Sequence, residues 1–498
     1  MALREIIFFP ARLDMSSRLS THDGSMTSGP ARRRTMTDRL LKYLLDPRRV
    51  SHKYLLQFLL CLFLSGPTFF DNFFNACATD IMQNMEMTHE DFSLLVSIPS
   101  ITGIFCGAVA GMVSAYGSTL TALVTAVVAF IGEVVVAYGI ENSSFSTVMT
   151  GRIIFVLSWN LLGSVQKVII FRQFTGQALA IIFALKIIAI RIGAVSGLYF
   201  AGTILTEAGG SLSTAMFYAV ILSGVSLVCT IAFAYLYRGS STARLIRPLM
   251  IGHRRNRNNI SSDQSSTGLS LNIPRDTWIC CGIIFLYYGG LVPFETFGVD
   301  YLVTEYKLTR SEAGHALALI PFFSFFSFMI SPLITNVRRQ LYGVIIATLL
   351  VASSIGFEMI GAPYSPNLYL CLIGIGHMVV ANAVWLALAG VSPTESQKTN
   401  AASISSAIYA VSTFTFNWMT GRVRDMTGSY DLALSVLSGL ITAASFLAVY
   451  LQGWGRWSDI PSVQEQLLME DEISPQSRDE VHQHNPVIDD NHFVPERN

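Results

Sequence analysis

Apolar stretches long enough to form membrane-crossing helices recur along this chain and alternate with short polar segments. An α-helix of about 20 residues spans the roughly 30 Å hydrocarbon core of a bilayer. Twelve stretches meet this length, so the pattern predicts an all-α polytopic membrane protein with twelve transmembrane helices. The predicted spans are residues 54–76, 92–114, 118–139, 147–170, 178–205, 213–236, 278–301, 312–335, 340–360, 368–391, 401–421 and 431–452.

A basic polar segment, residues 237–277, divides these spans into six and six. Two pseudo-symmetric six-helix halves joined by a cytosolic linker are typical of secondary transporters of the major facilitator type, whose halves rock around a central site to give alternating access. We therefore predict a transporter with this fold. Its predicted regions are a basic N-terminal tail, an N-terminal half, the linker, a C-terminal half and an acidic C-terminal tail, covering residues 1–53, 54–236, 237–277, 278–452 and 453–498.

The composition argues against a soluble protein. Only 13% of the residues are charged, against about 25% in soluble domains, and the mean hydropathy is +0.48. The sequence contains no nucleophile–base pairing, phosphate-binding loop or cluster of metal ligands, so we predict no enzyme, no cofactor and no metal site. The expected partners are a small-molecule substrate and the lipid bilayer, and no nucleic acid.

The distribution of positive charge predicts the orientation in the membrane. With the N-terminus in the cytosol, the predicted cytosolic segments carry 25 Lys and Arg residues and the predicted lumenal loops carry 4. Lys and Arg concentrate on the cytosolic side of membrane proteins, so both termini are expected there. The sequon Asn142-Ser143-Ser144 then faces the lumen, and whether it is glycosylated stays open.

Small residues follow one another at spacings of four in three of the predicted spans, the third being the eleventh span with Ala402, Ser406 and Ala410. The second span contains Gly103, Gly107 and Gly111, and the fifth contains Gly193 and Gly197. Such stripes let helix backbones approach closely in lipid. They are expected either in static packing within a half or along the seam between the two moving halves.

Cations inside the predicted spans call for an explanation, because each costs about 2.5–3.5 kcal/mol at mid-bilayer. Arg191 is the deepest, roughly 20 Å from the cytosolic end of its helix. It either forms a structural ion pair or presents its guanidinium to a substrate in the cavity. Lys167 and Lys186 lie nearer the cytosolic side, where they either snorkel, gate the cavity or contact the substrate.

Acidic candidates accompany these cations within the spans. Asp71 lies in the first span, Glu133 in the third and Glu295 in the seventh. Each could neutralise a buried cation, bind the ammonium group of a substrate or exchange a proton. The sequence does not rank these three roles.

Polar and aromatic side chains complete the set of candidates. Asn160 lies two helical turns from Lys167 on the same helix face, so we expect both to face the cavity. Asn382 and Trp385 are expected in the cavity wall, where an indole ring can attract a cation. Arg152 lies near the lumenal end of its span and is expected to orient helices there.

The stretch GRIIFVLSWNLLGSVQKVIIFRQFTGQALAIIFALKIIAIRIGAVSGLYFAG resembles the fourth and fifth helices of the lysosomal dipeptide transporters, the major facilitator superfamily domain-containing protein 1 family. The resemblance covers residues 50–452 and implies a lysosomal uniporter that exports dipeptides, aided by a glycosylated single-span accessory subunit. The supporting motifs are Phe70-Asp71-Asn72, Ile131-Gly132, Tyr287-Tyr288, Val292-Pro293-Phe294, Ala383-Val384-Trp385 and Pro393.

Departures from the family pattern concern the charges of the cavity. The family's glutamate in the fourth helix, which meets the amino end of the peptide, is matched by Asn160, whereas the arginine implicated with the peptide carboxylate is retained as Arg191. Lys167 and Lys186 stand where the family has uncharged polar residues. The superfamily loop G-x-x-x-D-R is reduced to GMVSAYGST. The resemblance thus implies a more cationic cavity and poor handling of cationic dipeptides.

The leading hypothesis is a facilitative carrier of dipeptides or similar zwitterionic solutes at a lysosome-like membrane, with other endomembranes and the plasma membrane left open. An organic-anion carrier that uses Arg191, Lys186 and Lys167 is the alternative within transport. A non-transporting membrane scaffold is the alternative from a different class. A scaffold has no need of an arginine at mid-membrane, which argues against it.

Overall fold

The computed structural model describes residues 50–104, 118–173, 176–239, 274–326, 337–359, 365–392 and 395–454. All of them belong to one unit of the chain, Pro47–Asn498. Most of the linker, of both tails and of the GMVSAYGST loop lies outside the described residues, so the predictions made for those segments stay predictions.

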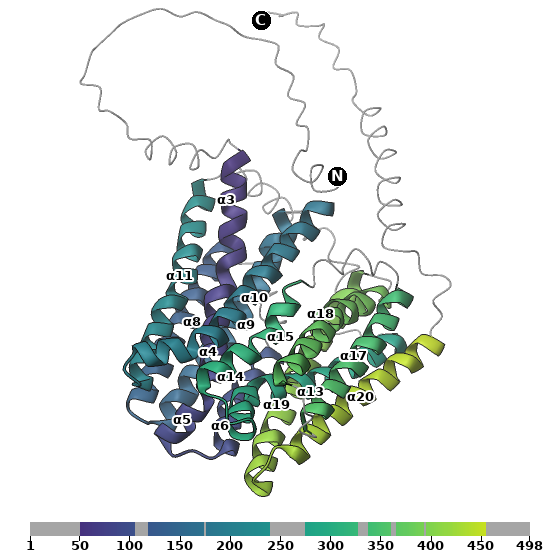
Figure 1. Ribbon diagram of the computed structural model, residues 1–498. Coiled ribbons are helices and arrows are strands. Elements are labelled where there is room, and N and C mark those ends of the chain that lie inside the picture. Colours follow the sequence, from purple (N-terminus) through teal and green to yellow (C-terminus); the bar gives the residue numbers. More distant parts are fainter. Residues whose placement is uncertain are drawn as a thin grey trace, which may run out of the picture. The chain divides into compact units, whose positions relative to one another are not determined.

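The described part of the N-terminal half is built of helices (Figure 1). A bilayer interior offers no water to backbone N–H and C=O groups, so each of these groups must find its partner within a helix. The helices are α3 (Val50–Cys61), the short 3-10 helix η1 (Leu62–Leu64), α4 (Ser65–Ala76), α5 (Ala78–Met85), α6 (His89–Ile101), α8 (Ser118–Glu141), α9 (Phe145–Gln173), α10 (Gly176–Glu207) and α11 (Leu212–Gly239).

The described part of the C-terminal half is helical as well, and no described residue of either half lies in a strand. Its helices are α13 (Arg275–Glu305), α14 (Arg310–Leu317), α15 (Leu319–Ser324), α17 (Val337–Met359), α18 (Pro366–Gly390), α19 (Glu395–Thr427) and α20 (Asp431–Trp454). The predicted all-α class is therefore confirmed.

Nine described helical segments are long and apolar enough to cross a membrane, and they coincide with nine of the twelve predicted spans. Two further predicted spans, 92–114 and 312–335, run into residues outside the described part. The remaining one, 401–421, lies within α19, a continuous helix of 33 residues that is too polar to be counted among the nine.

The helices α6 and α14, which begin the second predicted span of each half, start with the same capping arrangement. Thr88 accepts a hydrogen bond from the backbone amide of Asp91 at the start of α6, and Thr309 accepts one from the amide of Glu312 at the start of α14. In both cases the acidic side chain accepts in return from the threonine amide. The repetition supports a common plan for the two halves.

Each half packs mainly around its own helices. In the N-terminal half α8 lies against α9 and α11, and α4 lies against α10 and α11. In the C-terminal half α17 lies against α18 and α20, and α13 lies against α19 and α20. Contacts of α6 with α19 and of α10 with α14 join the halves.

The two glycine stripes serve different contacts. A Cβ added to Gly193 would lie 2.2 Å from the carbonyl oxygen of Ser65, and Gly197 packs against the same helix, α4, so this stripe allows close packing inside the N-terminal half. A Cβ on Gly103 would instead lie 3.4 Å from Cβ of Ala410, across the seam between the halves. The rest of the second-span stripe lies outside the described residues.

Ion pairs join the halves at the end of the molecule predicted to face the lumen. His89 at the start of α6 lies 3.3 Å from Asp300 of α13 and 2.8 Å from Asp425 of α19. Burial lowers the pKa of His89, but the hydrogen bonds and negative charges of these two carboxylates outweigh burial and raise it. Two more pairs of the described chain, Asp80 with Arg310 and Glu90 with Arg422, lie at the same end.

Candidate substrate cavity

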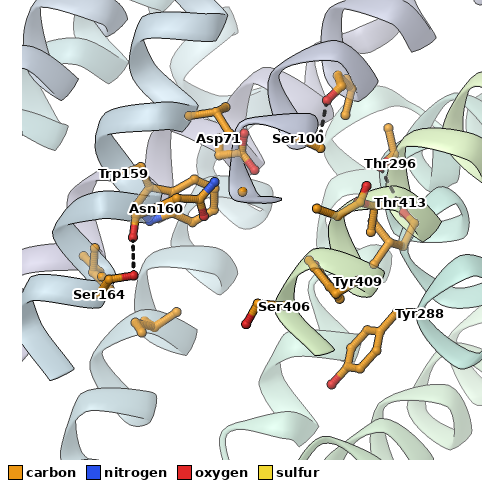
Figure 2. A pocket seen from close by; sticks show the side chains of 18 of the residues that line it. Asp71, Ser100, Trp159, Asn160, Ser164, Tyr288, Thr296, Ser406, Tyr409 and Thr413 are labelled. Carbon is orange, nitrogen blue, oxygen red and sulfur yellow. Dashed lines mark hydrogen bonds between the residues drawn. The ribbon is translucent and has the colours of Figure 1, made fainter. Parts of the chain in front are cut away.

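A cavity of about 550 Å³ lies between the two halves. Its walls come mainly from α4, α6, α9 and α10 on one side and from α13, α18 and α19 on the other. In Figure 2, Asp71, Trp159 and Asn160 lie on one side, with Tyr288 and Tyr409 across from them. Cavities of roughly 300–1,000 Å³ are usual for small-molecule sites, so this one has the size expected for a small solute.

Of the sequence candidates for substrate contact, which are the six residues below together with Glu133 and Asn382, the structure brings six to the cavity wall. Asn160 and Lys167 both line it, as their shared face of α9 suggested. The six are Asp71, Asn160, Lys167, Lys186, Arg191 and Trp385.

Glu133 and Asn382 are not among the residues that line this cavity. Glu133 is buried on α8, and its carboxylate accepts a hydrogen bond of 2.9 Å from the hydroxyl of Ser223 on α11. As a candidate for the ammonium group of a substrate, Glu133 is therefore corrected: it lies outside this cavity, because its face of α8 packs against α11. Asn382 lies one turn before Trp385 on α18 and donates a 3.4 Å hydrogen bond to the carbonyl of Met378.

Arg191 lines the cavity from α10, and its guanidinium contacts a histidine that does not line the cavity. Its Nη2 lies 3.0 Å from Nε2 of His377 on α18, whose Nδ1 lies 3.1 Å from the hydroxyl of Tyr287 on α13. Among the described residues, no carboxylate lies within ion-pair distance of Arg191, although Glu295 is near enough to interact electrostatically. The guanidinium is thus available to an anionic group in the cavity.

Asp71 carries a charge that the protein already balances. It pairs with Arg152 at 2.7 Å, and this arginine is 2% exposed, with its guanidinium carbon 4.5 Å from the ring centre of Phe74. The pair joins α4 to α9 near the end of the bundle predicted to be lumenal. Because Asp71 also lines the cavity, its remaining hydrogen-bonding capacity faces that space.

Two lysines line the part of the cavity that lies farther along α9 and α10 toward the predicted cytosolic side. Lys186 is 5% exposed, whereas Lys167 is exposed within the structure. With Arg191 and Arg152 they place four cations on the wall, where the lining residues supply one carboxylate, that of Asp71, which is paired with Arg152. The wall therefore favours solutes that carry negative charge.

Aromatic rings form much of the remaining wall. Trp385 donates a hydrogen bond of 3.3 Å to the hydroxyl of Tyr288, and the rings of Tyr288 and Tyr409 meet edge to face with centres 5.0 Å apart. Trp159 stacks on Phe155, with ring centres 5.8 Å apart. Of these aromatic residues, the sequence analysis predicted only Trp385 in the cavity wall.

Comparison with solved structures identifies the fold. The proton:xylose symporter XylE of the major facilitator superfamily matches 82% of this chain over 97% of its own, with a TM-score of 0.61 and 12% identity. This chain has the major facilitator fold. A peptide transporter POT in complex with alafosfalin shares that fold, with a TM-score of 0.58 and 12% identity over 84% of this chain and 98% of its own.

Sequence relatives refine the comparison. The lysosomal dipeptide transporter MFSD1 of Mus musculus is 24% identical over 377 residues, covering 71% of this chain and 76% of the relative. MFSD1 of Bos taurus is 24% identical over 434 residues, covering 82% and 87%. No family model matches the chain. The resemblance inferred from the helix motifs is confirmed. The nine described helices that are long and apolar enough to cross a membrane agree with a multi-pass membrane protein.

Proposed function

We propose that this chain is a facilitative carrier of dipeptides or closely related small zwitterions, working as a uniporter by rocking alternating access. The observation that carries the proposal is the guanidinium of Arg191 at the cavity wall, held by His377 and unpaired with any described carboxylate. A guanidinium fork binds a carboxylate through two parallel hydrogen bonds, and every dipeptide has a terminal carboxylate. The MFSD1 relatives, named as dipeptide transporters, support the same substrate class.

The amino end of the peptide has a less obvious site. Asn160 offers an amide oxygen but no charge, and Asp71 offers a carboxylate already paired with Arg152. Dipeptides with neutral or acidic side chains are therefore proposed as the preferred substrates. Trp385, Lys167 and Lys186 are proposed to contact their side chains; Asn382 and Glu133, once candidates for contact, are left with no direct role.

An organic-anion carrier is the second candidate, and the two lysines favour it. Lys167 and Lys186 add positive charge to a wall that already contains Arg191. A small organic anion needs these cations and no ammonium site. Because the described residues of the cavity wall provide no strong site for an ammonium group, the wall suits an organic anion better than it suits the amino end of a dipeptide.

The proposed setting is a lysosomal membrane, with both termini in the cytosol and a single-span glycosylated accessory subunit beside the carrier. The name of the MFSD1 relatives supports the lysosome, and the charge distribution of the sequence supports the orientation. The accessory subunit rests on the family resemblance alone.

Reconstitution into liposomes tests the proposal. We expect saturable uptake of neutral and acidic dipeptides, without accumulation above equilibrium under an imposed proton gradient. Arg191→Ala should abolish uptake, and Arg191→Lys should also fail because an ammonium cannot reproduce the planar fork. Arg339→Ala, at an exposed position near the start of α17, is the matched control and should transport normally.

Two results would count against it. Normal transport by Arg191→Lys would make Arg191 a charge balancer and not a ligand. Saturable uptake of organic anions that no dipeptide inhibits would favour the second candidate.

A further inference from the structure

A chain of three buried or half-buried side chains crosses the seam between the halves behind the cavity wall. Arg191 on α10 donates to Nε2 of His377 on α18 at 3.0 Å, and Nδ1 of His377 lies 3.1 Å from the hydroxyl of Tyr287 on α13. His377 is 3% exposed and Tyr287 is fully buried. Neither lines the cavity, whereas Arg191 does.

The hydrogen-bonding capacity of the three groups sets the state of the imidazole. A guanidinium has only donors, so Nε2 of His377 must accept and therefore carries no proton. The neutral ring then has its proton on Nδ1, which donates to the oxygen of Tyr287. The near-parallel rings of Tyr287 and His377, 12° apart with centres separated by 6.1 Å, limit rotation of the imidazole.

A restrained imidazole also restrains the guanidinium in front of it. An arginine side chain has several rotatable bonds and loses rotamer entropy when it binds a ligand. A fixed acceptor on one nitrogen reduces that loss, and the remaining N–H groups stay available for the cavity. The acceptor is uncharged, so it does not compete with a substrate carboxylate for the positive charge.

We propose that His377 is a positioning residue for substrate binding, which holds the Arg191 guanidinium toward the cavity through an unprotonated Nε2 fixed by Tyr287. The proposal rests on the proposed function, in which Arg191 binds the substrate carboxylate. Because Arg191 belongs to the N-terminal half and His377 to the C-terminal half, the contact also makes carboxylate binding sensitive to the arrangement of the halves.

Two amide substitutions separate the roles of the two ring nitrogens. His377→Gln can place its amide oxygen near the position of Nε2 and keep an acceptor for Arg191. His377→Asn can place its amide nitrogen near Nδ1, which keeps the donor to Tyr287 and leaves Arg191 without its acceptor. Cys371→Ala, elsewhere on α18, is the control for substitutions in this helix.

Uptake into liposomes is measured for each variant with an acidic dipeptide that the wild type transports. We expect His377→Asn to raise the apparent KM about tenfold with a smaller change in maximal rate, since one charge-assisted hydrogen bond is lost. His377→Gln and Cys371→Ala should stay within about threefold of the wild-type KM. Equal KM values for the Gln and Asn variants, whether both normal or both raised, would overturn the proposal.

The protonation of the His377 ring can also be measured by NMR, which tests the proposal independently of any transport assay. In ¹⁵N-histidine-labelled protein, the signals absent from His377→Gln belong to His377, and their shifts tell a protonated from an unprotonated ring nitrogen. We expect protonated Nδ1 and unprotonated Nε2, and the opposite tautomer or a doubly protonated ring would refute the contact. A wild type that transports no dipeptide would defeat the proposed function, while this spectrum would still decide the role of His377 toward Arg191.

Discussion

Replacing Asn160 with glutamate should shift the substrate preference of the carrier toward cationic dipeptides. Asn160 lines the cavity on α9, and the residue seven positions later, Lys167, lines it as well. A new carboxylate at position 160 would attract a substrate lysine and repel a substrate glutamate. The cavity is large enough for a small solute and its solvent, so the added side chain need not be fully dehydrated.

The size of the effect follows from Coulomb's law. For charges about 8 Å apart and an effective dielectric constant of about 40, the interaction is about 1 kcal/mol. The new carboxylate would stabilise a cationic substrate by this amount and destabilise an anionic one by the same amount. The difference of about 2 kcal/mol corresponds to a change of roughly 30-fold in the ratio of the two affinities.

The assay is competition between a lysine-containing and a glutamate-containing dipeptide in liposomes, for the wild type and for Asn160→Glu. Asn160→Gln, which keeps the amide and adds no charge, is the control and should leave the ratio unchanged. The shift should shrink as salt is added, because ions screen charges in a solvent-filled cavity. An unchanged ratio in Asn160→Glu would show that this position does not face the bound substrate.

Three further predictions concern packing, pH and topology. Gly193→Ala should lower the free energy of unfolding by about 1–3 kcal/mol, and with it the melting temperature, because its Cβ would meet the backbone oxygen of Ser65 at 2.2 Å. Gly439→Ala should not, because beyond its own helix backbone no described atom lies within 4 Å of the added Cβ. Equal melting temperatures of the two variants would contradict the packing of α10 on α4. The raised pKa of His89 means that its contacts stabilise the folded state below the pKa of the unfolded chain and lose this contribution as pH rises through the folded pKa. His89→Gln should therefore lower the melting temperature more at pH 5 than at pH 8.5, and an equal loss at both would refute the assignment. In sealed vesicles whose cytosolic face points outward, added protease should digest a C-terminal tag. A protected tag would overturn the predicted topology.

The helices could be read from the sequence because the bilayer permits few alternatives. A long apolar stretch in lipid must satisfy its backbone internally, so length and hydropathy alone predicted the nine spans that the described residues confirm. Depth could be read in the same way: Arg191 lies near mid-helix in α10 whatever its neighbours are. The spacing of seven between Asn160 and Lys167 predicted a shared face, and both line the cavity.

Which face of a helix meets the cavity was decided only by the tertiary structure. In a soluble helix the polar face points to water, but in a membrane bundle lipid and the packed interior are both apolar, so the pattern does not distinguish them. Glu133 therefore looked as suitable as Asp71, yet one bonds to Ser223 on α11 and the other lines the cavity. His377 lies 186 residues from Arg191 in the chain, and only the tertiary structure brings the two side chains together. Length and hydropathy of the chain by themselves predicted the nine spans that the described residues confirm and the depth of each charge along its helix, because both are local properties of the chain. Partners across the cavity depend on contacts that no local pattern contains.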